Sequence, residues 1–413
     1  MTAKGGARRL ETQVLVLVTL ALVAFGLVMV YSATSASAAL GDGDPNYYLK
    51  RQGVYAVLGV AVMLVASRFD FRGLRHLAPA LLLASLVLCA LVLLAPPVNG
   101  ARRWIAVGPV TFQPSELAKL ALAVWVAAHL ARRRLPQTLG ELMRPIGLVV
   151  ALFCLLILAG RDLGTAIALV VMLLGLLLVS GVPFRVLGAG AGIMVGLGTL
   201  AIAIEPYRRE RLFSFLDPWS DPQNSGFQTI QALIGLGSGG ILGDGLGESV
   251  QKIFYLPEAH TDMIFAIVGE ELGLVGAAAV IVAYAVFAWA GLRVALACKD
   301  PFGKRLAAAL VILVCGQAAI NLAAVLALAP LTGIPLPFVS YGGSNLVVQL
   351  ASVGILLNIA ANGSRARASV RDRSRGDGWS RAAGARGRGR AARGRREDDV
   401  RRVAGSRRGA ARP

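Results

Sequence analysis

Residues Gln13–Tyr31, QVLVLVTLALVAFGLVMVY, contain no charged side chain, and runs of this kind decide the class of fold. A helix that crosses a membrane needs about 20 apolar residues, because it rises about 1.5 Å per residue through a hydrocarbon core about 30 Å thick. The run lacks the alternation of apolar and polar residues that strands of a membrane barrel show. Because it is long enough to span, we interpret it as a first transmembrane helix and not as a cleavable signal.

Similar apolar blocks recur along the chain of 413 residues, of which 56% are hydrophobic. The mean hydropathy of +0.66 excludes a soluble globular protein. We therefore predict an all-α polytopic membrane protein with about ten transmembrane helices. The expected spans lie near residues 13–33, 53–68, 77–96, 115–131, 144–160, 163–181, 185–205, 263–294, 304–330 and 342–361. A large loop, 206–262, separates spans seven and eight, and we expect part of it to re-enter the membrane beside a cavity.

Positive charges alternate between the loops as they do in a multi-pass protein of the cell inner (cytoplasmic) membrane. Lysine and arginine residues cluster before span one, in every second loop after it, and behind span ten. Loops rich in these residues stay in the cytoplasm, so both termini are predicted to be cytoplasmic. The loop 206–262 and the active face are then outside. The predicted organisation is a short N-terminus, 1–12, a membrane domain, 13–362, and a tail, 363–413.

The tail carries most of the net charge of +19, because it holds 17 arginines against 5 acidic residues. Its composition of glycine, alanine and arginine is that of a disordered segment. A basic segment could bind nucleic acid, but we favour contact with anionic lipid headgroups and predict no nucleic-acid partner. The four cysteines of the chain are scattered without the spacing of metal ligands.

The outer loop ends in its chemically richest stretch, EAHTD (258–262). Asp262 stands where the loop meets an apolar helix, so it could cap that helix by accepting backbone N–H groups. Alternatively it is a general base, because a carboxylate at the mouth of an apolar cavity has its charged form disfavoured. Glu270 and Glu271 lie about two turns deeper, where each is either paired with a cation or acts directly on a substrate.

A second polar cluster, Arg102, Arg103, Trp104, Glu116 and Lys119, precedes and opens the expected fourth span. Glu116 and Lys119 are three residues apart on one helix face, where they could form a local ion pair. The alternative is that Arg102, Arg103 and Lys119 bind an anionic phosphate group at the outer leaflet. Trp104 is either an interfacial anchor or a platform for a sugar ring, and the sequence alone favours the anchor.

A third polar stretch, GIPLPFVSYGGS (333–344), precedes the last span. Its two prolines and paired glycines predict a rigid, non-helical loop. The hydroxyl groups of Ser340 and Ser344, with nearby backbone amides, could bind a polar ligand, although a purely structural bend fits the pattern equally well. Gln317 and Asn321 in span nine are of a type that more often joins helices than binds substrate.

Three motifs together resemble the SEDS family, the shape, elongation, division and sporulation proteins of the FtsW/RodA/SpoVE type. They are QPSELAK (113–119), LPEAHTD with the following GEELG (256–273), and TGIPLPFVSYGGS (332–344). The resemblance covers about residues 12–362 and leaves out the tail. Ala259 and Gly269 make the chain more similar to the division-type branch than to the elongation type.

The resemblance implies a peptidoglycan glycosyltransferase that polymerises lipid II on the outer face of the cytoplasmic membrane during cell division. By this analogy Asp262 deprotonates the acceptor hydroxyl, whose oxygen attacks the anomeric carbon and expels undecaprenyl pyrophosphate. Cationic residues would stabilise that leaving group. The implied partners are lipid II, the nascent glycan strand, membrane lipids, a class B penicillin-binding protein and divisome proteins. The alternatives are an elongation-type polymerase and a lipid II flippase.

The expected site residues form three groups, of which the catalytic group is Asp262 alone. Residues expected to bind substrate are Arg102, Arg103, Trp104, Glu116, Lys119, Glu258, His260, Ser340 and Ser344. Residues expected to support the site are Asp162, Lys252, Glu270 and Glu271. The sequence demands no cofactor, although a divalent cation could bridge Asp262 or Glu258 to pyrophosphate.

One turn departs from the family pattern. Gly160-Arg161-Asp162 stands where members of the family commonly carry Gln-Pro or Glu-Pro before the aspartate. Losing the proline removes a fixed bend, and Arg161 adds a cation that could pair with Asp162. The departure leaves the predicted fold unchanged and the role of the turn open.

Overall fold

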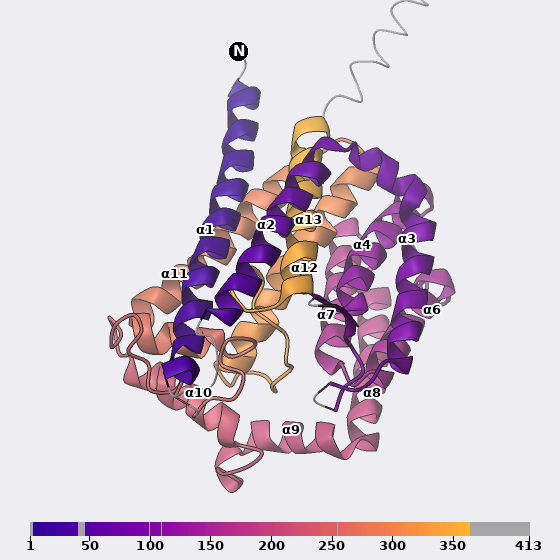
Figure 1. The fold of residues 1–413 in the computed structure, drawn as a ribbon. Helices are drawn as coiled ribbons and strands as arrows, with labels where there is room; N and C mark the ends of the chain where they lie inside the picture. The colour runs from indigo at the N-terminus through magenta and orange to yellow at the C-terminus, as the bar shows by residue number, and fades with distance from the viewer. Residues whose placement is uncertain (1–2, 40–45, 99, 109, 254, 364–413) are drawn as a thin grey trace, which may run out of the picture. The chain divides into compact units, whose positions relative to one another are not determined.

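The computed structural model describes residues 3–39, 46–98, 100–108, 110–253 and 255–363, which are mostly helical (Figure 1). The longer helices are α1 (Ala3–Ala39), α2 (Tyr47–Arg68), α3 (Phe71–Leu91), α4 (Pro114–Arg132), α6 (Leu148–Ala159), α7 (Leu163–Ser180), α8 (Phe184–Ile204), α9 (Pro206–Leu216), α10 (Phe227–Ser238), α11 (Ile264–Ala297), α12 (Pro301–Val325) and α13 (Gly343–Asn362). The shorter elements are η1 (Val92–Leu94), α5 (Leu139–Leu142), the π-helical turn η2 (Met143–Gly147) and η3 (Pro218–Ser220). Strands β1 (Ile105–Val107) and β2 (Val110–Phe112) form an antiparallel hairpin with Ala106 opposite Thr111. The tail predicted to be disordered lies outside the described residues.

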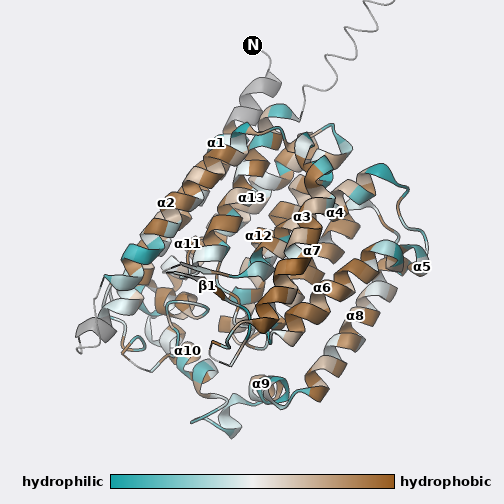
Figure 2. Cartoon of the chain, turned by 45° about the vertical axis from the view of Figure 1, so that its right-hand side comes forward, coloured by the Kyte–Doolittle hydropathy of each residue, from teal (hydrophilic) through white to brown (hydrophobic). Residues whose placement is uncertain are grey.

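Within the described ranges, nine helical stretches are apolar and long enough to cross a membrane: α1, α2, α3 with η1, α5 to α6, α7, α8, α11, α12 and α13. Figure 2 shows these helices largely in the apolar colours. The remaining predicted span, the fourth at 115–131, is α4, whose 19 residues include Glu116 and Lys119 and are mostly buried among the other helices. The prediction of an all-α polytopic membrane protein is confirmed.

The most extensive helix contacts join α2 to α13, α11 to α12, α1 to α11, and α3 to α4. The backbones of α2 and α13 come close at Gly354, which has no side chain. A Cβ atom there would overlap the carbonyl oxygen of Met63. A polar contact joins the same pair, since Asn358 Nδ2 donates to Ser67 O at 2.8 Å. Small residues and interhelical hydrogen bonds of this kind hold membrane helices together where water supplies no hydrophobic force.

The helix after the outer loop, predicted as one unbroken span, is interrupted at Gly273, whose φ of 63° and ψ of −163° are not helical. The outer loop fills the interruption. Leu274 N donates to Gly240 O at 2.9 Å, and Asp244 N donates to Glu270 O at 3.0 Å. These bonds replace helical ones that the break removes, as buried backbone groups require. The outer loop is therefore hydrogen-bonded to the backbone of α11 at the break. That part of this loop re-enters the membrane stays a prediction.

Three predicted boundaries are wrong for local reasons. α3 begins at Phe71 and not near residue 77, because the Asp70 side chain caps it by accepting from Arg72 N. α2 begins at Tyr47 and not near residue 53, because the helix continues through the polar residues that precede the apolar block. The span predicted at 304–330 ends at Val325, since Ala327 adopts a positive φ of 52° that terminates the helix.

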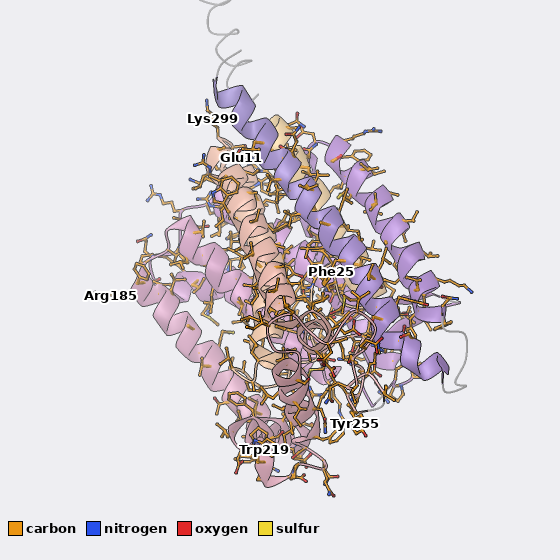
Figure 3. The ribbon with its side chains drawn as sticks, turned by 90° about the vertical axis from the view of Figure 1, so that its left-hand side faces the viewer. Glu11, Phe25, Arg185, Trp219, Tyr255 and Lys299 are labelled. Carbon is orange, nitrogen blue, oxygen red and sulfur yellow. The ribbon has the colours of Figure 1, made fainter. Side chains whose placement is uncertain are left out.

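α1 begins and α13 ends on the same side of the bundle, and α9 lies across its opposite end (Figure 1). Figure 3 shows Glu11 and Lys299 at the first end and Trp219 and Tyr255 at the second. Arg293 Nε donates to Glu11 Oε1 at 3.2 Å, so a basic residue near the end of α11 meets α1 close to its start. The end that carries α9 is therefore the end that the charge pattern predicts to be outside.

We expect Gly273→Ala to lower the stability of the purified protein by roughly 2 kcal/mol, because the positive φ is strained for any side chain. A Cβ atom there would also lie 2.4 Å from Gly243 N and 2.5 Å from Ile241 O, both of them backbone atoms. The control is Gly196→Ala in α8, whose added Cβ has no atom within 4 Å. Thermal unfolding in detergent measures both variants, and equal midpoints would contradict strain at Gly273.

Candidate functional site

A cavity of about 1600 Å³ lies at the end of the bundle that carries α9. Its polar walls come from the start of α2, the β-hairpin, the start of α4, the turn between α6 and α7, α9, the loop before α11 and the loop before α13. Its apolar part is lined by Ile167 and Val171 of α7, Ile202 of α8 and Ile320 of α12. The volume exceeds that of a typical pocket for one small ligand.

Asp262 lies on the cavity wall directly before α11, half-buried. The capping alternative is wrong, because Met263 is the residue that precedes the helix and no side chain caps the first turn. Thr261 Oγ1 donates to Asp262 Oδ1 at 3.1 Å. Asn321 Nδ2 donates both to the backbone carbonyl of Asp262 at 2.7 Å and to Ile334 O at 2.8 Å. Asn321 thus joins α12 to the two loops of the site.

The electrostatic surroundings favour Asp262 as a proton acceptor. Burial raises the pKa of this carboxyl, the hydrogen bond from Thr261 and the positive charge of Arg211 lower it, and the charge of Glu258 raises it further. Burial is the largest of these causes, so the pKa lies above its ordinary value. A carboxylate of raised pKa binds a proton more readily than an exposed one does.

His260 and Glu258 line the same wall. Burial lowers the pKa of His260 to about 4, so this imidazole is neutral near pH 7 and a weak base. His260 Nε2 lies 3.9 Å from Glu258 Oε2, a contact that carries no ion-pair energy while the ring is neutral. His260 is therefore a poor candidate for a base near pH 7, and its contact with a substrate stays a prediction.

Besides Arg51 of α2, four arginines line the cavity, and we call these four the cationic side. They are Arg103 just before the hairpin, Arg161 in the α6–α7 turn, and Arg208 and Arg211 in α9. Arg161 pairs with Glu205 at 3.5 Å, rather than with Asp162.

Two members of the cationic side come from α9. Arg208 donates to Leu158 O at 2.9 Å, and Arg211 donates to Leu331 O at 3.2 Å. A Cβ atom at Gly333 would lie 4.0 Å from both Arg211 Nη1 and Asp262 Oδ2, so a cation and the carboxylate flank the same glycine. Sequence reasoning overlooked Arg208 and Arg211. The available signal is their cluster on the outer side, where positive charge is not expected.

Of the other predicted residues of the second cluster, some line the cavity and some do not. Trp104 lines the cavity, half-buried. Arg102 points elsewhere and donates to Leu93 O at 3.0 Å. Lys119 and Glu116 are fully buried and form an ion pair at 2.9 Å. Of these two residues, Glu116 lines the cavity. The ion-pair interpretation of these two residues therefore describes the geometry.

Neutral amide side chains form hydrogen bonds to the ion pair of Glu116 and Lys119. Lys119 Nζ donates to Gln317 Oε1 at 2.7 Å, and Asn345 Nδ2 donates to Glu116 Oε2 at 2.8 Å. Gln349 Nε2 donates to the same Gln317 oxygen at 3.1 Å. This network joins α4, α12 and α13 below the cavity floor, and it satisfies charges that would otherwise be costly to bury.

Three further predicted residues hold loops in place. Asp162 caps α7, since Oδ1 accepts from Thr165 N at 3.0 Å, and its Oδ2 accepts from Gln113 Nε2 at 2.9 Å. Ser340 Oγ accepts from a backbone amide within its own loop. Ser344 Oγ accepts from Gln113 N at 3.1 Å. Both serines are buried behind the cavity wall, so their geometry fits the structural bend rather than a contact with a ligand.

Glu270 and Glu271 are paired away from the cavity. Lys252 Nζ lies 3.0 Å from Glu271 Oε1, and Ser32 Oγ donates to the same oxygen at 2.6 Å. Glu270 accepts from Ser249 Oγ and from backbone amides of the outer loop. The geometry is that of paired carboxylates, and the supporting role of Lys252 and the two glutamates in the site stays a prediction.

Among the described residues, no three His, Cys, Asp or Glu side chains are grouped as ligands for a metal ion. A divalent cation between Glu258 or Asp262 and a pyrophosphate would therefore take its remaining ligands from the substrate and water.

Comparison with known proteins gives a match to the family model of the FtsW, RodA and SpoVE cell cycle proteins over residues 12–365. A probable peptidoglycan glycosyltransferase FtsW of Geobacter metallireducens is 43% identical over 352 residues, 84% of this chain and 94% of the relative. Its counterpart in Halomonas elongata is 41% identical over 363 residues, 86% of this chain and 91% of the relative.

Two solved structures are similar to this chain in fold and in sequence. A chain from a study of the structural coordination of polymerization and crosslinking by a peptidoglycan synthase complex has a TM-score of 0.70 and 31% identity, over 85% of this chain and 97% of its own. The rod shape determining protein RodA of Thermus thermophilus has a TM-score of 0.63 and 30% identity, over 85% of this chain and 96% of its own.

We expect Glu116→Gln to destabilise the protein by roughly 3–5 kcal/mol, because it leaves Lys119 buried without its partner charge. The double variant Glu116→Gln, Lys119→Met removes both charges and should be less destabilised than the single variant. Arg102→Ala, outside the cavity, is the control for a lost surface charge. Thermal unfolding in detergent measures all three, and a single variant as stable as the double variant would contradict the role of the pair.

Proposed function

The chain belongs to the FtsW/RodA/SpoVE family of cell cycle proteins, and on this premise we propose that it is a division-type peptidoglycan glycosyltransferase with Asp262 as its general base. The observation that carries the proposal is the position of Asp262, a carboxylate of raised pKa on the wall of a large cavity, beside the cationic side. The substrate is lipid II, and the product is a glycan strand at the outer face of the membrane.

The reaction is a displacement at the anomeric carbon of the donor. Asp262 takes the proton of the acceptor sugar's hydroxyl, and the oxygen forms a bond to the anomeric carbon. The bond from that carbon to the pyrophosphate oxygen breaks, and its electron pair leaves with undecaprenyl pyrophosphate. The proton then passes from Asp262 to solvent, which restores the carboxylate for the next sugar.

The cationic side supports charge on the departing pyrophosphate. Arg211 and Arg103 line the cavity, and Arg211 flanks Gly333 together with Asp262. Fixed cations near the place where negative charge develops lower the barrier of the reaction. Lys119 and Arg102 lie outside the cavity wall, so we assign the role once expected of them to these arginines. Trp104, on the wall of the cavity, contacts a sugar ring in this scheme.

The apolar part of the cavity suits the lipid chain of the substrate. Ile167 and Val171 of α7 and Ile202 of α8 line it at membrane-spanning helices. An isoprenoid chain could therefore enter from the bilayer while its pyrophosphate and sugars stay among the polar walls. A flippase would also need a lipid-lined path, but the position of Asp262 at the outer end of α11 favours catalysis there.

The charge pattern and the fold together support the proposed membrane orientation. α1 begins and α13 ends on the side where Arg293 meets Glu11, and the cavity lies at the opposite end. We propose that the protein lies in the inner membrane with both termini cytoplasmic and the cavity outside. The synthase complex among the structural relatives couples polymerization to crosslinking, which supports a class B penicillin-binding protein, and with it other divisome proteins, as partners of this chain.

Asp262→Asn is expected to reduce glycan synthesis from lipid II by about 10²–10⁴-fold, the contribution typical of a general base. The assay uses purified full-length protein, alone and with a class B penicillin-binding protein, and follows glycan strands on a gel. Asp217→Asn, an exposed aspartate of the outer loop, is the matched control. Undiminished synthesis by Asp262→Asn would contradict its role as the base, and transfer of lipid II across liposomes without glycan synthesis would favour the flippase.

The rate of glycan synthesis should fall as the pH is lowered through the raised pKa of Asp262, because only the deprotonated carboxylate accepts a proton. Arg211 lowers this pKa, so Arg211→Gln is expected to move the acidic limb of the pH–rate profile to higher pH. The neighbouring Arg209→Gln is exposed and should leave the limb unchanged. The idea fails if both variants show the wild-type profile.

A further inference from the structure

One wall of the cavity is aromatic. Tyr47, Tyr48, Tyr55, Tyr341 and His260 all line it, and we call this group the tyrosine wall. Tyr48 lies at its centre, with ring centroids 5.3 Å from Tyr47, 5.2 Å from Tyr341 and 4.5 Å from His260. His260 and Tyr341 are 5.4 Å apart. Segments far apart in the sequence thus bring their rings together beside the base.

The wall is fixed by bonds that do not depend on a ligand. Tyr341 N donates to His260 O at 2.9 Å, which joins the loops before α11 and α13. Thr111 N of the hairpin donates to Tyr55 Oη at 3.2 Å. Arg51 Nη1 donates to Tyr47 Oη at 2.8 Å, and its guanidinium lies 5.9 Å from the centre of that ring. The surface is therefore preformed.

Two ordinary roles for aromatic residues do not account for this group. Tyrosines that anchor a membrane protein at the interface face lipid, whereas these rings line the cavity. A packed aromatic core would be buried throughout, whereas in this group Tyr55 alone among the tyrosines is buried, Tyr48 and Tyr341 are half-buried and Tyr47 is 50% exposed. Rings that are ordered, exposed to a cavity and equipped with hydroxyl groups are suited to a ligand with both apolar faces and polar edges.

The charges of the side chains on the tyrosine wall indicate which class of ligand it fits. His260 is neutral near pH 7, because burial lowers its pKa to about 4, and burial raises the pKa of Tyr341 to about 12, so its hydroxyl keeps its proton. Arg51 is the cation beside these rings, whereas Arg208 and Arg211 belong to the cationic side. The tyrosine wall therefore fits an uncharged ring with hydroxyl groups better than a pyrophosphate.

We propose that the tyrosine wall is a saccharide subsite, on which an N-acetylated sugar ring of the acceptor stacks against Tyr48 and Tyr341 and accepts hydrogen bonds from Arg51. The assignment to the acceptor rests on the proposed function, since Asp262 follows His260 by two residues and their Cα atoms are at most about 7 Å apart. A ring held on this wall places its edge within reach of the base.

The direct test measures binding of chitotetraose, a soluble N-acetylated saccharide without lipid or phosphate, to the full-length protein in nanodiscs. The Asp262→Asn protein is used, so that binding is measured without turnover. Tyr48→Leu and Tyr341→Leu should weaken binding roughly tenfold, while the phenylalanine variants, which keep the ring, stay within about twofold. Tyr255→Leu, an exposed outer-loop tyrosine outside the cavity, is the control. No binding by the parent protein, or equal binding by the leucine variants, would overturn the proposal.

A kinetic readout separates this subsite from the base. With lipid II as substrate, Tyr48→Leu should raise KM roughly tenfold and leave kcat within about threefold, and Tyr48→Phe should restore KM. Asp262→Asn should lower kcat instead. If Asp262→Asn keeps full activity but the leucine variants lose chitotetraose, the assignment of the base fails and the saccharide subsite stands. Thermal unfolding of each variant identifies any that fails to fold, and Tyr341→Leu then provides the second measurement.

Discussion

Two adjacent carboxylates, Glu270 and Glu271, lie buried in α11, and the arrangement of the outer loop depends on pairing them. A charge buried among membrane helices costs several kcal/mol unless partners surround it. Lys252 of the outer loop lies 3.0 Å from Glu271, and Val250 N of the same loop donates to Glu270 at 2.9 Å. The loop must therefore fold back onto α11. The break at Gly273 makes this possible, because it opens the helix backbone to hydrogen bonds from the loop.

The same pairing sets the position of the candidate base. Asp262 directly precedes the part of α11 that the outer loop holds, and Asn321 of α12 binds its backbone carbonyl. Because Asn321 also binds Ile334 O, the end of the outer loop and the loop before α13 are held as one unit. The bond between Tyr341 N and His260 O joins the two loops a second time. The base and the tyrosine wall thus share one rigid support, which is what stacking a sugar beside a proton acceptor requires.

The membrane spans were predictable, because each depends on a local run of apolar residues, and the presence of Asp262 on a cavity wall followed from its place between a polar loop and an apolar helix. The burial of Lys119 was not predictable, since its partner Gln317 lies on a helix almost 200 residues away. The break at Gly273 was equally hidden, because the apolar run around it contains other glycines, such as Gly276 and Gly291, that stay helical. Arg211 left a signal in the sequence, positive charge on the outer side, but its approach to Gly333 depends on the tertiary fold.

The cavity wall carries four carboxylates that are at least half-buried, and the partners of three of them tie those three to the fold. Glu205 pairs with Arg161 at 3.5 Å. Glu116 is bound by Lys119 and Asn345, so its charge is used to hold three helices together. Asp162 accepts four hydrogen bonds, from Thr165 twice, Gln113 and Ser115, and serves as the cap of α7. Asp262 differs, because burial raises its pKa more than Thr261 and Arg211 lower it. Three of these carboxylates therefore hold neighbouring elements together, and Asp262, at the junction of the cationic side and the tyrosine wall, keeps the raised proton affinity on which its proposed role as the base depends.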